Sequence, residues 1–197
     1  VSTANTCPRF SQLSEELKTQ HLLAHIRLAS VGSVSRVNTH PFFSSGFAFM
    51  HNGTLQNFAR HQSLFEAEIA PARRAAIQGD TDSERCFALF LTFLDGDRSP
   101  DTANMVRSLL KVIDVAQNVF GDAADGSPSA MNFMVSDGKR LVATRHRRTL
   151  YTARSEDTLF IASEHLWPNI PWEDVPESAA LTIDEDLSLD IRHRSQW

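Results

Sequence analysis

The strongest constraint on the fold is a pair of alternating apolar runs joined at Asp137-Gly138, in the stretch MNFMVSDGKRLVATRH. Alternation with a period of two predicts half-buried strands, and Asp-Gly is typical of the tight turn of an antiparallel hairpin. Further strands are predicted for the apolar runs His21–Ser30, Phe47–Met50, TLFIASE and AALTID. The chain is therefore expected to build antiparallel sheets.

Helical patterns lie mostly between the early and late strands. A short surface helix is predicted over Ser11–Gln20 and a longer one from Thr54 to about Glu68. Thr81-Asp82-Ser83-Glu84 has the form of a capping box and predicts the start of a third helix. Apolar residues at helical spacing from Met105 to Phe120 predict a fourth. Helices clustered between antiparallel strands favour an α+β layered fold over alternating βαβ units.

Composition limits the classes of protein to consider. The 197 residues are enough for one domain, and residues 1–197 are predicted to form a single one. The formal net charge of −5 argues mildly against nucleic acid as a partner. Only two cysteines occur, which favours a reducing, cytoplasmic location. No stretch approaches the roughly 20 apolar residues of a membrane span. The opening VSTANTCPRF lacks an initiator Met, so we expect a fragment or a processed product.

Four short segments combine polar side chains with predicted strand ends or turns. Arg27 carries a forked guanidinium that suits a carboxylate. Asn52 offers a side-chain amide and Gly53 an accessible backbone N–H, which together predict an oxyanion hole. Asp82, in a first helical turn, offers a carboxylate for a cation. Such a set describes a site for an amino acid whose side-chain carbonyl is attacked. The four segments are His25-Ile26-Arg27, Asn38-Thr39-His40-Pro41-Phe42, His51-Asn52-Gly53 and Gly79–Glu84.

Each of these residues also has a purely structural interpretation. Arg27 could be a surface strand residue, Asp82 only a helix cap, and Asn52-Gly53 a plain turn. His40 before Pro41 could be a buried histidine with structural hydrogen bonds. A metal site built on His25, His40, His51 and Asp82 is a further alternative, but the HExxH pattern of zinc hydrolases is absent, so neither a metal nor another cofactor is expected.

The order of these segments resembles a known family. AHIRLASVG, NTHPF, FMHNGTLQNF and GDTDSE follow one another as in the class II glutamine amidotransferase domain of the N-terminal-nucleophile hydrolase superfamily. The resemblance extends from about His21 to about Ile183 and is greatest to stand-alone members, some of which act on γ-glutamyl compounds. It implies a four-layer α-β-β-α sandwich of antiparallel sheets, here expected to be incomplete at the N-terminus.

The resemblance also implies roles for individual residues. Arg27 would bind the α-carboxylate of glutamine and Asp82 its α-ammonium group. The Asn52 side chain and the Gly53 N–H would hold the tetrahedral oxyanion, at a corner where the strand ends. Ser30 would lie near the carboxylate. His40 and His51 would support the pocket without transferring protons.

The nucleophile is where the chain departs from the family. Members attack with an N-terminal cysteine, whereas residue 1 here is Val1. Cys7 lies in a Pro-flanked loop and Cys86 on the apolar side of a predicted helix, so neither is expected to be the nucleophile. The resemblance implies an amidotransferase or γ-glutamyl amide hydrolase with a thiol acyl-enzyme mechanism and its cysteine outside this chain. The alternative is an inactive module that binds glutamine or a γ-glutamyl compound. A separate synthase or peptidase subunit and a homo-oligomer are possible partners.

Overall fold

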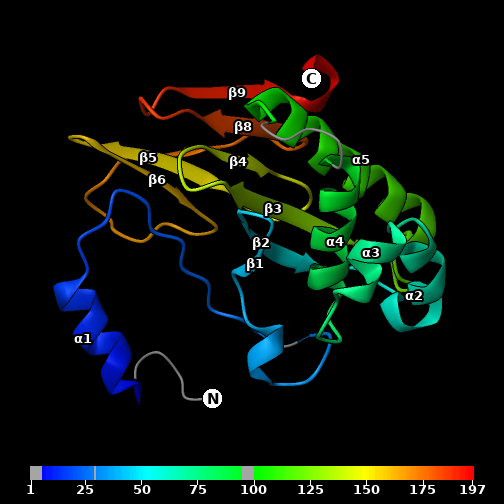
Figure 1. Ribbon diagram of the computed structural model, residues 1–197. Coiled ribbons are helices and arrows are strands. Elements are labelled where there is room, and N and C mark those ends of the chain that lie inside the picture. Colours follow the sequence, from blue (N-terminus) through cyan, green and yellow to red (C-terminus); the bar gives the residue numbers. More distant parts are fainter. Residues whose placement is uncertain (1–5, 29, 95–99) are drawn as a thin grey trace.

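The computed structural model describes residues 6–28, 30–94 and 100–197 (Figure 1). Its larger sheet has six strands in the order β1-β2-β3-β4-β8-β9, and its smaller sheet has three in the order β6-β5-β7. Every pairing is antiparallel, as predicted. The strands are β1 Phe42–Ser44, β2 Phe47–Thr54, β3 Ala130–Ser136, β4 Leu141–Thr144, β5 Tyr151–Ser155, β6 Thr158–Ala162, β7 Trp172–Asp174, β8 Ala179–Ile183 and β9 Leu189–His193.

Helices pack on one face of the larger sheet, and the smaller sheet packs on its other face (Figure 1). The ring of Phe49 on β2 stacks on Phe87 of α4, with centroids 5.1 Å apart, and contacts Phe133 of β3. On the opposite face, Leu181 of β8 lies in a cluster with Ile161 of β6. The described helices are α1 Pro8–Glu16, α2 Phe58–Ala67, α3 Pro71–Ala75, α4 Asp82–Leu94 and α5 Thr102–Phe120, with 3₁₀ turns at Arg36–Asn38 and Arg194–Gln196.

The predicted α+β class is confirmed, with a helical layer followed by two sheets. The predicted surface helix forms over Pro8–Glu16, three to four residues earlier than expected, and has no buried residue. Figure 1 shows this helix α1 apart from the helical layer of α4 and α5. Among the described residues, no helix is both long enough and apolar enough to cross a bilayer.

Local sequence accounts for the two long helices. Asp101 caps α5 by accepting a hydrogen bond from the Asn104 N–H, at 2.7 Å. At the start of α4, only half of the predicted capping box forms. Thr81 Oγ1 accepts from the Glu84 N–H at 3.2 Å, but the Glu84 carboxylate turns back to the N–H groups of Gln78 and Gly79. Glu84 therefore holds the turn before the helix instead of closing the box.

The hairpin predicted at Asp137-Gly138 is confirmed between β3 and β4, in the register Val135↔Val142. The Asp137 carboxylate accepts hydrogen bonds from the N–H groups of Lys139 and Arg140, at 3.0 and 2.7 Å. This Asx-type turn fixes the register that the alternation requires.

The strand predicted over His21–Ser30 was wrong. Residues 21–28 make no backbone–backbone hydrogen bond to other described residues, so no ladder forms; residue 29 lies outside the described residues. The side chains of Ile26 and Leu28 are 90% and 94% exposed. Alternation alone does not make a strand, because a strand also needs a partner for its N–H and C=O groups.

The corner predicted at Asn52-Gly53 was also wrong. Strand β2 does not end at Met50 but continues to Thr54, with Asn52 opposite Asn132 and Gly53 opposite Met131 of β3. The long partner strand β3 satisfies these backbone groups, which outweighs the turn preference of Asn-Gly. Helix α2 begins at Phe58 instead of Thr54, after Asn57 in the left-handed conformation at φ 57°.

Candidate functional site

The site forms along the free edge of β2. Strand β1 pairs with β2 only as far as Phe49, so the edge beyond that residue is open. The segment after His25 lies there. His25 Nε2 donates to the His51 carbonyl at 3.1 Å, and Ser30 Oγ is 2.8 Å from Thr54 Oγ1. The segment that carries Arg27 and Ser30 is thereby placed beside the end of β2.

A pocket of about 550 Å³ opens between this segment and the start of α2. Ser30, Val31 and Gly32 form one wall, and the continuous stretch 54–60 forms the other. This volume lies within the usual range for small-molecule sites. The volume is therefore large enough for an amino acid.

The Arg27 side chain contacts the first wall through backbone carbonyl groups. Its Nη1 donates to the Ser33 carbonyl at 3.0 Å, and its Nη2 donates to the carbonyls of Val31 and Gly32. The guanidinium is thus fixed beside the pocket by three backbone acceptors. If a carboxylate bound the guanidinium, a charged acceptor would replace these neutral carbonyl acceptors, and hydrogen bonds to a charged acceptor are stronger.

Asp82 contacts the second wall. Its Oδ2 accepts a hydrogen bond from the pocket-lining Leu55 N–H at 2.8 Å, and its Oδ1 accepts from the Ser83 N–H at 2.8 Å. The residue is only 4% exposed. Arg27 and Asp82 therefore contact different walls of the pocket, each through a backbone group of that wall, while neither side chain lines it.

The backbone geometry of Gly53 agrees with an anion-binding role. The N–H of its partner Met131 bonds to His146 on the far side of β3, so Gly53 and Met131 form a non-hydrogen-bonded pair. The Gly53 N–H consequently points to the free edge of β2, where Ser30 lies. A Cβ at Gly53 would overlap the Ala130 carbonyl oxygen and lie 2.6 Å from His51 Nε2, so glycine is required there.

Asn52 is exposed, and the register puts it on the same face of β2 as Thr54, which lines the pocket. Its neighbour His51 faces the helices instead. His51 Nε2 lies 3.0 Å from the Ala130 carbonyl, which can only accept, so Nε2 carries the hydrogen. His51 Nδ1 forms a hydrogen bond with Ser83 Oγ at 3.0 Å. His51 thus joins β2 to α4 outside the pocket.

His40 likewise lies outside the pocket. Its ring stacks on His25 with centroids 4.2 Å apart and meets Phe42 edge-on. Neither ring nitrogen has a hydrogen-bond partner among the described residues. Burial, together with the neighbouring His25, His51 and Arg27, lowers the pKa of His40 to about 3. His40 is neutral at ordinary pH and packs as an aromatic ring.

The described residues contain no group of three or more His, Cys, Asp or Glu side chains arranged to hold a metal ion. The two cysteines also lie outside the site. Cys86 is fully buried, and burial with the nearby Asp82 carboxylate raises the pKa of its thiol well above the ordinary value. Cys7 directly precedes α1, which Figure 1 shows apart from the start of α4.

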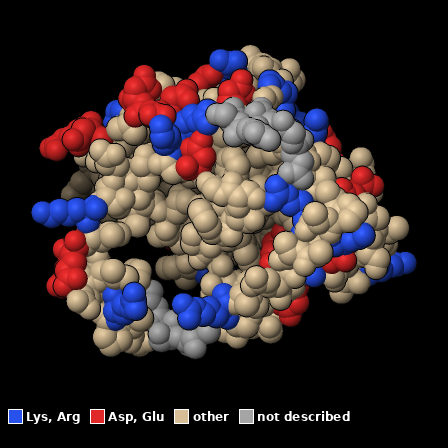
Figure 2. All heavy atoms as spheres, viewed as in Figure 1, with Lys and Arg blue, Asp and Glu red and all other residues tan. Residues whose placement is uncertain are grey.

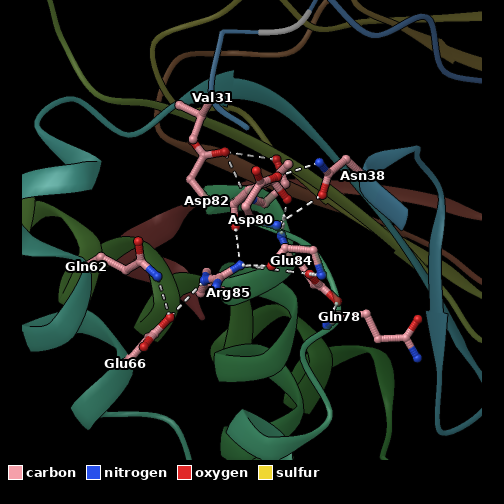
Figure 3. A network of polar contacts seen from close by, with 12 residues as sticks. Val31, Asn38, Gln62, Glu66, Gln78, Asp80, Asp82, Glu84 and Arg85 are labelled. Atoms are coloured by element: carbon pink, nitrogen blue, oxygen red, sulfur yellow. Dashed lines mark hydrogen bonds and ion pairs between the residues drawn. The ribbon is translucent and has the colours of Figure 1, made fainter. Parts of the chain in front are cut away.

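Two residues that the sequence did not single out hold the site together. Asn38 is fully buried and forms a hydrogen bond with Asp80 (Figure 3). Its amide also donates a hydrogen bond to the Ser33 carbonyl. Arg85 supports the same turn by donating to the Gly79 carbonyl at 2.8 Å and to Glu66 at 2.9 Å. One signal in the sequence could have pointed to Asn38: it and Asp80 belong to two of the four polar segments, and Asp80 directly follows Gly79.

Charges of both signs lie on one face of the molecule. On the face shown in Figure 2, Lys and Arg side chains lie singly among acidic and uncharged residues.

Comparisons with known proteins identify relatives of this chain. The sequence profile of the family described as class-II glutamine amidotransferases matches residues 3–167. The probable glutamine amidotransferase DUG3 of Saccharomyces cerevisiae is 30% identical over 218 residues, which cover 91% of this chain and 61% of that protein. A putative glutamine amidotransferase of Haemophilus influenzae is 30% identical over 132 residues, 64% of this chain and 39% of its own length. The chain thus spans only part of these curated relatives.

Solved structures show the same fold. A glutamine aminotransferase class-II domain protein from Silicibacter pomeroyi matches with a TM-score of 0.74 at 21% identity, over 98% of this chain and 82% of that one. The glutamine phosphoribosylpyrophosphate amidotransferase of B. subtilis matches with a TM-score of 0.59 at 16% identity, over 86% of this chain and 34% of that one. Since the family profile covers well over half of its residues, the chain belongs to the class-II glutamine amidotransferases.

Proposed function

We propose that this chain binds glutamine, or the glutamyl part of a γ-glutamyl compound, and stabilises the oxyanion formed when the side-chain amide is attacked. The observation that carries the proposal is that Ser30 lines a pocket of about 550 Å³ whose walls are contacted by Arg27, through the Val31 carbonyl, and by Asp82, through the Leu55 N–H, with Gly53 directly before the lining residue Thr54. Arg27, Gly53 and Asp82 are not neighbours in the sequence, so this arrangement depends on the fold.

Recognition of the substrate follows from charge. The α-carboxylate would replace the backbone carbonyls that now occupy the Arg27 guanidinium and would gain a bidentate ion pair. The α-ammonium would approach Asp82 Oδ2, which retains one acceptor site beside its present hydrogen bond from the Leu55 N–H, whereas Oδ1 already accepts two hydrogen bonds from Ser83. The side-chain amide would then extend along the free edge of β2.

The reaction would begin with attack of a thiolate on the side-chain carbonyl carbon. The electron pair of the C=O bond would move to oxygen, where the Gly53 N–H and the Asn52 amide would stabilise the negative charge. Each donor of this kind lowers a barrier by roughly 3–4 kcal/mol. Collapse with protonation of the nitrogen would release ammonia and leave a thioester, which water would hydrolyse to glutamate and free thiol. The thiol would come from a cysteine outside these residues, because Cys86 is buried with a raised pKa.

The second candidate is a binding module without chemistry, which senses glutamine or a γ-glutamyl compound. If no other thiol reaches the pocket, the burial of Cys86 supports this binding module as well as it supports an enzyme with an external cysteine. The two candidates share the binding site and differ only in turnover.

Ammonia release from L-glutamine by the product of the complete gene tests the proposal. We expect turnover, and we expect Asn52→Ala to lower kcat by about 100-fold with little change in KM, since the oxyanion exists only after attack. Asn118→Ala is the control, because Asn118 is exposed on α5. If the folded protein binds glutamine without releasing ammonia, only the binding module remains as a candidate. A folded protein that does neither would end both candidates.

A further inference from the structure

Asn38 and Asp80 form a reciprocal pair across 42 residues of sequence (Figure 3). The Asn38 amide Nδ2 donates to Asp80 Oδ1 at 2.5 Å, and Asn38 Oδ1 accepts from the Asp80 N–H at 3.1 Å. Asn38 has no exposed surface. Every polar atom of its side chain is used, which fixes the turn before α4 against the 3₁₀ turn that ends at Asn38.

A third segment joins the pair at Ser33. The Ser33 N–H donates to both carboxylate oxygens of Asp80, at 3.2 Å each. The Ser33 carbonyl accepts from Asn38 Nδ2 at 2.9 Å and from Arg27 Nη1 at 3.0 Å. The peptide groups of Ser33 therefore connect the Asn38–Asp80 pair directly to the Arg27 guanidinium.

Two glycines provide room for the Asn38–Asp80 pair, because a side chain at either position would collide with it. A Cβ at Gly32, which has φ +77°, would lie 2.5 Å from Asp80 Oδ1. A Cβ at Gly79 would overlap Asn38 Oδ1 and lie 3.0 Å from Glu84 Oε2. The close approach of the three segments is thus built into the backbone at both sides of the pair.

We propose that Asn38 and Asp80 are positioning residues of the glutamine site, which set the distance between the Arg27 wall and the Asp82 wall of the pocket. This inference rests on the proposed function. The pair acts through Ser33 on Arg27 and through the adjacent Thr81 on Asp82, and it does not line the pocket. Its loss should weaken glutamine binding and raise KM, with kcat changed much less.

The test compares three variants of the 197-residue chain. Asn38→Asp places two carboxylates against each other and removes a donor. The exchanged pair Asn38→Asp with Asp80→Asn restores one amide donor facing one carboxylate. Asp186→Asn is the matched control, because Asp186 is also an exposed loop aspartate that accepts from a backbone N–H, that of Ser188 at 2.9 Å.

Two measurements are made on each variant: amide hydrogen exchange at Ser33 and Asp80, and the affinity for L-glutamine by calorimetry. We expect Asn38→Asp to speed both exchange rates and to weaken binding at least 10-fold. The exchanged pair should recover a large part of the affinity, and Asp186→Asn should change neither quantity. Circular dichroism checks that each variant is folded; if Asn38→Asp unfolds, the milder Asp80→Asn takes its place with an expected loss of a few-fold.

The outcomes separate the two claims. Equal glutamine affinities in the unsubstituted and Asn38→Asp chains would overturn the positioning role, even where exchange is faster. Failure of the exchanged pair to recover any affinity would also count against it. Absence of glutamine binding by the unsubstituted chain would overturn the proposed function itself.

Discussion

The carboxylate of Asp82 accepts a hydrogen bond from the backbone N–H of Leu55, at 2.8 Å. This single contact ties the start of α4 to the pocket wall that follows β2. The wall and the proposed ammonium receptor consequently form one unit, in which a single carboxylate orders the backbone and is the proposed partner of the substrate ammonium.

Substitution of Asp82 should separate these two tasks. Asp82→Asn keeps an oxygen for the Leu55 N–H but removes the charge, so we expect glutamine affinity to fall about 10-fold with a small change in stability. Asp82→Ala leaves the buried Leu55 N–H without an acceptor and should cost about 2–3 kcal/mol of unfolding free energy. Urea denaturation and glutamine calorimetry on both variants provide the measurements. Equal stabilities of the two variants would show that the contact does not hold the wall.

Gly53 should not tolerate a side chain. Because a Cβ there would overlap the Ala130 carbonyl oxygen, Gly53→Ala should lower the unfolding free energy by about 3 kcal/mol. Gly46→Ala is the control, since Gly46 has φ +82° and no atom within 4 Å of the added Cβ. It should cost about 1–2 kcal/mol from backbone strain alone. Thermal melts of the two variants with the same midpoint would contradict the close packing of β2 on β3.

Stability should depend on pH through His40. The pKa of His40 is lowered from 6.5 to about 3 in the folded chain. Above pH 6.5 the ring is neutral in both states and contributes nothing. Below pH 6.5 the unfolded chain takes up a proton that the folded chain excludes, so stability falls by about 1.4 kcal/mol per pH unit until about pH 3. Replacing the ring by His40→Phe should remove this part of the slope in urea titrations between pH 6 and pH 4. An unchanged slope would mean that His40 is open to protons.

Cys86 should be unreactive in the folded chain. Its thiol is fully buried and its pKa is raised, so little thiolate forms and no reagent reaches it. Mass spectrometry after brief treatment with iodoacetamide should find Cys86 unmodified in the native chain and modified in urea. The Cys86→Ala variant should bind glutamine as the unsubstituted chain does. Rapid native labelling of Cys86, slowed by glutamine, would instead make it a candidate nucleophile.

The sequence predicted the elements whose signals are local. The helix ending at Phe120 and the hairpin at Asp137-Gly138 depend on apolar periodicity and on turn chemistry within a few residues, and both are confirmed. The segment order also indicated the family correctly, because several weak matches in series constrain one another. The roles of Arg27, Asn52, Gly53 and Asp82 remain predictions.

The predictions failed where the local structure depends on contacts with residues that are distant in the sequence. Asn52-Gly53 reads locally as a turn, yet β3 pairs with both residues and keeps them within a strand. Residues 21–28 alternate like a strand, yet no described strand offers them a ladder. Asn38 was overlooked because its importance comes from Asp80, 42 residues away. Such contacts have no signature within a single stretch of sequence.

The most direct test of the central claim is a calorimetric titration of the chain with L-glutamine, repeated with Arg27→Ala and with the exposed control Arg36→Ala. The account predicts binding that Arg27→Ala weakens by about 10- to 100-fold, in line with the loss of charge-assisted hydrogen bonds, and that Arg36→Ala leaves unchanged. No binding by the unsubstituted folded chain, or equal binding by the Arg27→Ala variant, would contradict it.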